Sequence, residues 1–192
     1  MQGVLKSSKG FIMKMTNIYL LGVFHTFQTQ PSHTFTEYVC QTCAALRIKS
    51  LAEEMNHDAL RDACTSHSTV KPIADKLSIP HAYCDPDQNE RQARGIRGEN
   101  DLKFQRWLNE WSDDEFVHRK ALHCQKREEV WIEKLQDVFI KPMLFICGID
   151  HLDTFGSLLN HRGFSSKQLE KRWTPNQPLQ PTKLDRRNEV SR

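Results

Sequence analysis

Short apolar runs alternate along the chain with longer segments in which apolar residues recur every three or four positions. Runs rich in Ile, Leu, Val and Phe that end at turn residues are typical of buried parallel strands, and the three-four spacing is typical of amphipathic helices. Strands are predicted over residues 17–25, 48–55, 80–87, 143–148 and 167–173, the third of them running into a turn. The alternation predicts an α/β fold, with a mostly parallel central sheet of about four to five strands enclosed by helices.

The predicted helices fill the spaces between these strands and cover residues 34–46, 56–77, 100–138 and 152–160. Ser32 or Thr34 is a suitable N-cap for the first helix, the second is expected to break near Ser66, and Gly163 is a suitable left-handed cap after the last. Residues 100–138 are long enough for two or three helices. They form a predicted helical insertion before the last core strand.

One side of the first part of this insertion is aromatic. Phe104, Trp107, Leu108 and Trp111 lie three and four positions apart, so they share one side of a helix. An apolar stripe of this kind usually faces the interior of the protein. We therefore expect these four side chains to pack in the core.

Composition narrows the class of protein. The net charge of +3 is scattered, without a basic stripe interleaved with aromatic residues, so no nucleic-acid partner is expected. Lys14 and Asn17 interrupt the first apolar stretch, so neither a signal peptide nor a membrane span is predicted, and a cytoplasmic location is expected. One domain is predicted at residues 16–174, between disordered segments at 1–15 and 175–192, because both ends are polar.

The six cysteines occupy irregular positions, and we expect reduced thiols rather than a disulfide framework. Cys40-x-x-Cys43 lies inside a predicted helix. The motif is therefore expected to serve packing rather than zinc binding or redox chemistry.

Two of the predicted strands end in the same pattern, Gly-x-x-His. The first is Gly22-Val-Phe-His25 and the second is Gly148-Ile-Asp-His151. Ligands of open α/β sheets bind at the carboxyl ends of the strands, so both histidines fall where a site is expected. A single histidine is more often a hydrogen-bonded structural residue, but two in matched settings favour a functional site.

Acidic residues stand at two further strand ends. Glu53 and Glu54 close the second predicted strand, and they point to opposite faces of the sheet if the strand is regular. Asp85 follows the third strand, and His81 lies within it. Asp150, between the glycine and the histidine of the second motif, is a further candidate.

Two imidazoles and one or two carboxylates suit a divalent ion such as Zn, Mn, Co or Fe(II), which would generate hydroxide near neutral pH. His25, Glu54 and His151 are the predicted metal ligands. Without a metal, His25 or His151 can act as a general base oriented by Glu53 or Glu54. Both versions predict hydrolysis.

Three segments together resemble a known family: Leu20-Leu-Gly-Val-Phe-His25, Arg127-Glu-x-x-Trp131-Ile, and the stretch from Cys147 to Gly163. In this order they resemble the TraB/TIKI family, within the wider erythromycin-esterase and ChaN-like group, over roughly residues 18–173. The resemblance implies an α/β sheet enclosed by helices, with a site of histidines and carboxylates used in hydrolysis, divalent-metal peptidase activity, or metal and haem handling.

By the same resemblance, His25 and His151 match the two motif histidines, Glu53 or Glu54 matches the acidic residue, and Arg127 matches the helical arginine. Glu128 stands where the family has asparagine. We expect His25, Glu53 or Glu54, and His151 to meet in one pocket.

Arg127 is expected to pair with Glu53, Glu54 or Asp150, because a buried guanidinium needs a carboxylate.

The leading hypothesis is a metal-dependent hydrolase, peptidase-like or esterase-like, that acts on a small molecule or a peptide without nucleic acid or membrane. One rival is a non-enzymatic metal- or ligand-binding protein of the same fold. The other is a stress-related interaction protein in which the motifs only close the fold.

Overall fold

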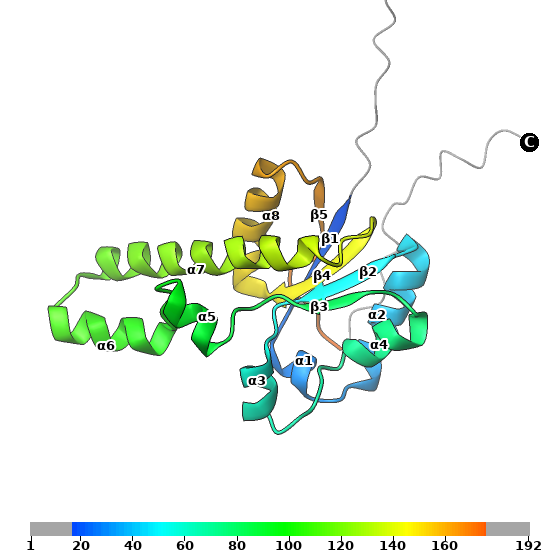
Figure 1. Ribbon diagram of the computed structural model, residues 1–192, viewed down its shortest axis with the longest axis horizontal. Helices are drawn as coiled ribbons and strands as arrows, with labels where there is room; N and C mark the ends of the chain where they lie inside the picture. Colours follow the sequence, from blue (N-terminus) through cyan, green and yellow to red (C-terminus); the bar gives the residue numbers. More distant parts are fainter. Residues whose placement is uncertain (1–16, 176–192) are drawn as a thin grey trace, which may run out of the picture.

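The computed structural model describes residues 17–175. Its core is a five-stranded sheet in the order β3-β2-β4-β1-β5, in which every neighbouring pair is parallel (Figure 1). The strands are β1 (Ile18–Val23), β2 (Ser50–Glu53), β3 (His81–Tyr83), β4 (Met143–Gly148) and β5 (Ser166–Glu170). The predicted α/β class and the predicted strand number are confirmed.

Helices cover both faces of the sheet (Figure 1). They are α1 (Thr26–Thr29), α2 (His33–Leu46), α3 (His57–Asp62), α4 (Lys71–Leu77), α5 (Gln88–Ala93), α6 (Glu99–Asn109), α7 (Asp113–Gln136) and α8 (Leu152–His161), with a 3-10 turn, η1 (Ile149–His151), before α8. Side chains of α2 and α4 pack on one face of the sheet, and those of α7 and α8 pack on the other.

Alternation along β2 separates the two cores. Leu51 belongs to the core under α2 and α4, whereas Ala52 belongs to the core under α7 and α8. Successive strand residues point to opposite faces. The two acidic residues that follow therefore leave the strand in opposite directions, which decides their partners.

Several local predictions are confirmed. Ser32 caps α2, accepting a hydrogen bond from the Phe35 amide, and Gly163 has the positive φ (+89°) expected after α8. The second predicted helix is broken near Ser66, into α3 and α4. A single helical turn, α1, follows β1 in a segment for which no helix was predicted.

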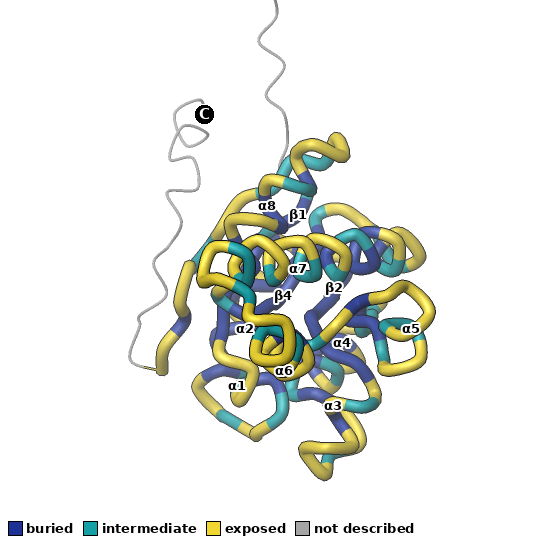
Figure 2. The backbone as a smooth tube through the Cα atoms, turned by 90° about the vertical axis from the view of Figure 1, so that its left-hand side faces the viewer, coloured by how far each residue is buried: buried dark blue, intermediate teal, exposed yellow. Residues whose placement is uncertain are grey.

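The prediction that the aromatic stripe of α6 packs in the core is wrong. Phe104, Trp107 and Leu108 are 58%, 75% and 57% exposed. Figure 2 shows α6 largely in yellow, the colour of exposed residues. The periodicity of the helix was recognised correctly, but α6 turns its polar side to α7, so the apolar side faces outward.

The two predicted disordered segments, residues 1–15 and 175–192, lie outside the described residues apart from Pro175. All six cysteines are free thiols, and Cys40 and Cys43 lie in α2 as expected. Among residues 17–175, no helix combines the length and the apolar character needed to cross a membrane.

Gly22, the glycine of the first Gly-x-x-His, lies where the chain passes close to β5. A Cβ atom at this position would overlap Leu152 Cδ1 and the carbonyl oxygen of Lys171. The Trp173 amide also donates to the Gly22 carbonyl at 2.9 Å, which fixes the following segment against β1. The first motif therefore needs glycine for close backbone packing.

Replacing Gly22 with Ala should lower the free energy of unfolding by about 1–3 kcal/mol, because the backbone oxygen of Lys171 cannot move aside as a side chain can. Gly156→Ala in α8 is the control, since its added Cβ would meet the flexible end of Leu20 at 3.3 Å and alanine favours a helix. Urea denaturation of both variants checks this. An equal loss of stability in both would contradict the close-packing explanation.

Candidate functional site

The carboxyl ends of the strands open into a cleft of about 850 Å³. Its lining includes His25 after β1, Glu54 after β2, Asp85 after β3, and His151 at the end of η1 after β4. Helix α7 forms another wall and contributes Arg127. Four consecutive crossovers of a parallel sheet thus bring residues from distant parts of the sequence to one edge.

The two motif histidines meet at Glu54, as expected. His25 Nε2 lies 3.7 Å from Glu54 Oε1, and His151 Nε2 lies 3.5 Å from the same oxygen. His25 is on the open side of the cleft, with its side chain 57% exposed, whereas His151 and Glu54 are buried. The predicted convergence is therefore confirmed, with Glu54 rather than Glu53 as the shared carboxylate.

Glu53 and His81 lie elsewhere, and their assignment to this cleft is wrong. Both belong to the face of the sheet under α2 and α4, because the alternation of β2 turns Glu53 away from Glu54. There Glu53 is fully buried and accepts hydrogen bonds from Ser68 Oγ and from Gln28 Nε2 at 3.0 Å. His81 Nε2 lies 2.8 Å from the same carboxylate.

Gln28 connects this second carboxylate to the cleft. Its Nε2 donates to Glu53, and its Oε1 lies 3.2 Å from His25 Nδ1. An amide oxygen can only accept, so His25 must carry hydrogen on Nδ1, which leaves Nε2 as an acceptor in the neutral ring. Glu53 therefore contributes to the site indirectly, by fixing the Gln28 amide that orients His25.

His151 is oriented by a carboxylate. Its Nδ1 lies 2.8 Å from Glu128 Oε1, which also accepts a hydrogen bond from Thr154 Oγ1 at 2.6 Å. Glu128 is itself buried. Helix α7 thus places a carboxyl group directly behind the imidazole of His151.

Arg127 joins α7 to the ends of two strands. Its Nη2 donates to Glu54 Oε1 and to Asp85 Oδ1, both at 2.7 Å, and its Nε donates to Asp85 Oδ1 at 3.0 Å. The prediction of a carboxylate partner is confirmed for Glu54. Asp85 is the second partner, while the exposed Asp150 lines the cleft without bonding Arg127.

Asp85 is held by several donors at once. Arg91 Nη2 and Asn56 Nδ2 donate to its Oδ2, and Trp131 Nε1 donates to its Oδ1 at 3.1 Å. Burial alone would raise the pKa of Asp85, but Arg127 and Arg91 hold this pKa below its ordinary value. Burial lowers the pKa of Arg127, and Asp85 and Glu54 more than reverse that effect. Both groups are therefore charged at neutral pH.

Gly148, the glycine of the second motif, lies directly against the meeting point of the side chains. Its amide donates to Glu54 Oε2 at 2.8 Å. A Cβ atom there would come within 3.0 Å of His25 Nε2 and 3.2 Å of Glu54 Oε2. This second glycine therefore leaves room for the functional side chains, whereas Gly22 leaves room for backbone.

The donor types at Glu54 suit a divalent ion, but their arrangement does not form a ready coordination sphere. Within residues 17–175, no three His, Cys, Asp or Glu side chains are grouped closely enough to hold a metal ion. Glu54 already binds Arg127 through Oε1 and the Gly148 amide through Oε2. A metal ion would have to displace Arg127 from Glu54.

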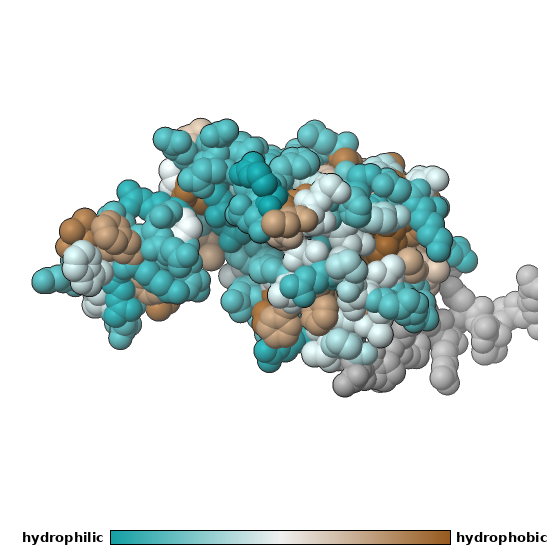
Figure 3. Space-filling view, turned by 90° about the horizontal axis from the view of Figure 1, so that it is seen from below, coloured by the Kyte–Doolittle hydropathy of each residue, from teal (hydrophilic) through white to brown (hydrophobic). Residues whose placement is uncertain are grey.

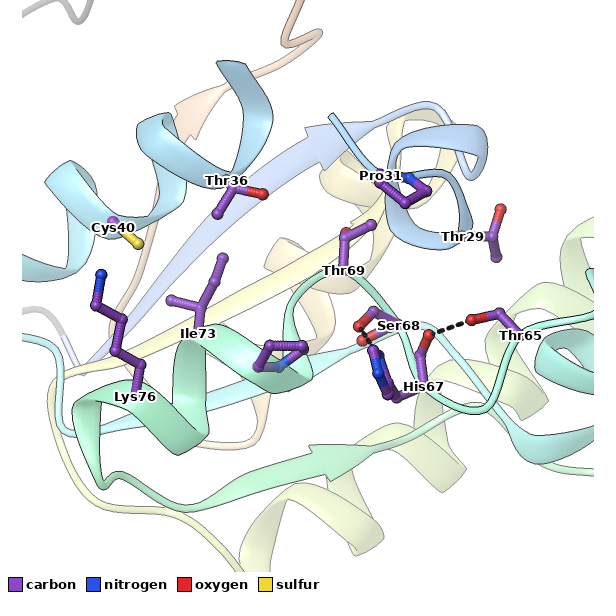
Figure 4. A pocket seen from close by; sticks show the side chains of 11 residues that line it. Thr29, Pro31, Thr36, Cys40, Thr65, His67, Ser68, Thr69, Ile73 and Lys76 are labelled. Atoms are coloured by element: carbon purple, nitrogen blue, oxygen red, sulfur yellow. Dashed lines mark hydrogen bonds between the residues drawn. The ribbon is translucent and has the colours of Figure 1, made fainter. Parts of the chain in front are cut away.

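A second, smaller cavity of about 310 Å³ lies on the other face of the sheet, beside α2 and α4 (Figure 4). Its hydroxyl groups are mostly bonded within the protein. Thr65 Oγ1 donates to the His67 carbonyl, Thr69 Oγ1 to the Phe27 carbonyl, and Ser68 Oγ to Glu53. These three hydroxyl groups are therefore already bonded within the protein.

No family model, curated protein or solved structure matches the chain. The resemblance to the TraB/TIKI family therefore stays a prediction from the order of the motifs. Gln28, Arg91 and Glu128 were missed as contributors to the site. Gln28 lies three residues beyond the first motif segment, and Glu128 lies within the second, but no spacing rule identifies their contacts.

Replacing Arg127 with Met should cost about 3–5 kcal/mol at pH 7, since it leaves Glu54 and Asp85 buried without a cation. The lowered pKa of Asp85 makes its ionisation stabilising above the unfolded value of about 3.9, and this contribution is lost as the pH falls through the folded value. In the variant the main lowering effect on Asp85 is gone while the burial that raises its pKa remains, so Asp85 can be neutralised near pH 4 and the deficit should shrink there.

Urea denaturation at pH 7 and pH 4 measures this difference. Arg127→Lys is the control: it keeps the charge but loses the planar fork, so an intermediate deficit is expected. A deficit of Arg127→Met that is equal at both pH values would mean that packing, rather than charge, is lost.

Proposed function

We propose that this protein is a hydrolase whose active site is the cleft around Glu54, with an ester or peptide as substrate. The observation that carries the proposal is the approach of two histidines, from two different strand ends, to one buried carboxylate oxygen. Structural histidines have no reason to converge in an open cleft. Imidazole also titrates near neutral pH, which suits it to proton transfer.

The surroundings of the two rings support different roles. His25 is exposed, and the neutral Gln28 amide fixes its Nε2 as an acceptor, so it suits the general base that takes a proton from water. The ring of His151 lies between two carboxylates, 2.8 Å from Glu128 through Nδ1 and 3.5 Å from Glu54 through Nε2. His151 therefore suits the general acid that protonates the leaving group.

Arg127 can stabilise the charge that develops on the substrate carbonyl. Its Nε and Nη2 are bonded to Asp85 and Glu54, but Nη1 makes only a 3.5 Å contact, with His151 Nε2. The bonded nitrogens hold the guanidinium rigidly, and Nη1 remains available as a donor. A fixed donor of this kind is the main requirement for stabilising an oxyanion.

A second candidate is the metal-dependent form of the same hydrolase, with Mn, Co, Zn or Fe(II) at His25, Glu54 and His151. It is favoured by the two Nδ1 atoms, each of which faces an oxygen of Gln28 or Glu128, so that each Nε2 can present a lone pair toward Glu54. A carboxylate behind a metal-binding histidine is a common arrangement. Such an ion would supply Lewis acidity and an activated water.

His25→Ala and His151→Ala variants separate these candidates. In the metal-free form, each substitution should lower turnover by about 100-fold or more, because general acid–base catalysis contributes about 10²–10⁴-fold. In the metal-dependent form, both should lose bound metal together with activity. His33→Ala is the control, since His33 is exposed on α2 and outside the cleft.

The measurements are hydrolysis of p-nitrophenyl esters and fluorogenic peptides, and elemental analysis of the purified protein with and without chelator. If the parent is active and both histidine variants keep its full activity, the proposal is contradicted. A parent that hydrolyses none of these probes but gains thermal stability from a divalent ion would instead favour the non-enzymatic binding protein.

Gln28→Leu should lower turnover by about tenfold and leave the substrate KM nearly unchanged, because it removes the group that fixes the tautomer of His25 without removing the base. Gln28→Glu should not restore the activity, since its second oxygen would face the buried Glu53 carboxylate instead of donating to it. The pH profile of kcat distinguishes the two variants. Equal activity of Gln28→Leu and the parent would show that Gln28 has only a structural role.

A further inference from the structure

The hairpin of α6 and α7 extends away from the sheet (Figure 1). It carries an exposed apolar surface, the α6 face, which consists of Phe104, Trp107 and Leu108. Figure 3 shows brown, hydrophobic surface on this projecting part of the molecule. The rings of Phe104 and Trp107 lie 6.1 Å apart, so the face is continuous along the helix.

The orientation of α6 is the reverse of the usual one. Its polar side packs on the hairpin partner: Arg106 binds Asp113 and lies 5.3 Å from the ring of Phe116. Only Leu102 is buried among the residues of α6. A helix that presents its apolar side to solvent is expected to bury it against a partner, because contiguous exposed apolar patches mark interaction sites.

The charges that flank the α6 face indicate which partner it takes. Lys103 lies in α6, and Glu110 is the residue that caps its C-terminus. The two are seven positions apart, nearly two turns, so their Cα atoms lie on the same flank of the face. If a second copy of α6 runs antiparallel across the first, about a two-fold axis between Arg106 and Trp107, each Lys103 lies opposite the second copy's Glu110. The face is thus complementary to itself.

The individual charges are compatible with this pairing. Glu110 is exposed and makes no hydrogen bond or ion pair within residues 17–175. Lys103 binds Glu99 Oε1 at 2.8 Å, but Glu99 Oε2 also takes Lys120 at 2.9 Å. Glu99 therefore remains paired with Lys120 when Lys103 binds Glu110 of the second copy.

A lipid surface fits less well. The connection at the tip of the hairpin is acidic, with Glu110, Asp113, Asp114 and Glu115 in sequence beside the α6 face. Anionic lipid headgroups would repel this cluster. A protein surface that offers both an apolar face and a lysine is the better match.

We propose that the α6 face is the contact of a homodimer, in which two copies of this chain pair antiparallel through Trp107 and the Lys103–Glu110 flanks. Symmetric pairing of one patch with itself is the commonest geometry of protein dimers. Two helices of about 16 Å length make a small contact, so the dimer belongs to the weak, concentration-dependent class. The inner side of α6 lines the cleft through Glu99 and Leu102, so dimerisation also braces one cleft wall.

Sedimentation velocity of the full chain over a wide concentration range tests the proposal, with a shift from monomer to dimer as the expected result. Trp107→Asp should weaken association by about 30-fold or more, the loss expected for a central tryptophan. Leu122→Asp, a change of the same kind at the exposed Leu122 of α7 outside this face, should leave it unchanged. Thermal melts show that both variants fold.

The charge pair gives the sharper test. Lys103→Glu and Glu110→Lys should each weaken self-association by about threefold to tenfold, since each places like charges opposite one another. An equimolar mixture of the two variants should recover the parental affinity, because each then meets an opposite charge twice. Failure of the mixture to recover would overturn the antiparallel arrangement. A parent that stays monomeric at every concentration would overturn the dimer itself, and would leave residues 1–16 or a foreign partner to cover the face.

Discussion

The ion pairs of Arg127 are the constraint on which the cleft depends. A single guanidinium bonds carboxylates at the ends of β2 and β3, and it reaches them from α7. Three buried carboxylates, Glu54, Asp85 and Glu128, surround the floor of the cleft. Arg127 and Arg91 bond the first two, and Glu128 bonds His151. Because Arg127 and Glu128 both come from α7, the position of this helix decides how the charges of the site are paired.

The two Gly-x-x-His motifs solve different packing problems with the same residues. In the first, a side chain on Gly22 would collide with backbone beyond β5; in the second, a side chain on Gly148 would collide with His25 and Glu54. The histidine follows three positions later in both, at the first turn after the strand. In both motifs the glycine therefore allows close packing at the end of a parallel strand, and the histidine places an imidazole over that end.

The sequence was sufficient for the fold and for most of the site, because strand runs and strand-end residues have strong local signals. Period-two alternation already assigned Glu53 and Glu54 to opposite faces, but it could not show which face holds the cleft. That depends on where α7 and Arg127 pack, a contact between residues far apart in sequence. Gln28 escaped notice for the same reason, since its function appears only when Glu53 is found behind it.

The error at α6 has a different origin, and it is informative about periodicity. An apolar stripe shows that one side of a helix avoids water, but it does not specify whether the covering surface belongs to the same chain. The polar side of α6 has its own partners in α7, through Arg106 with Asp113 and Phe116. Once those contacts fix the polar side inward, the same periodicity that predicts a core contact necessarily turns Phe104, Trp107 and Leu108 outward. In the proposed dimer, the stripe is covered by the second copy rather than by the chain to which it belongs.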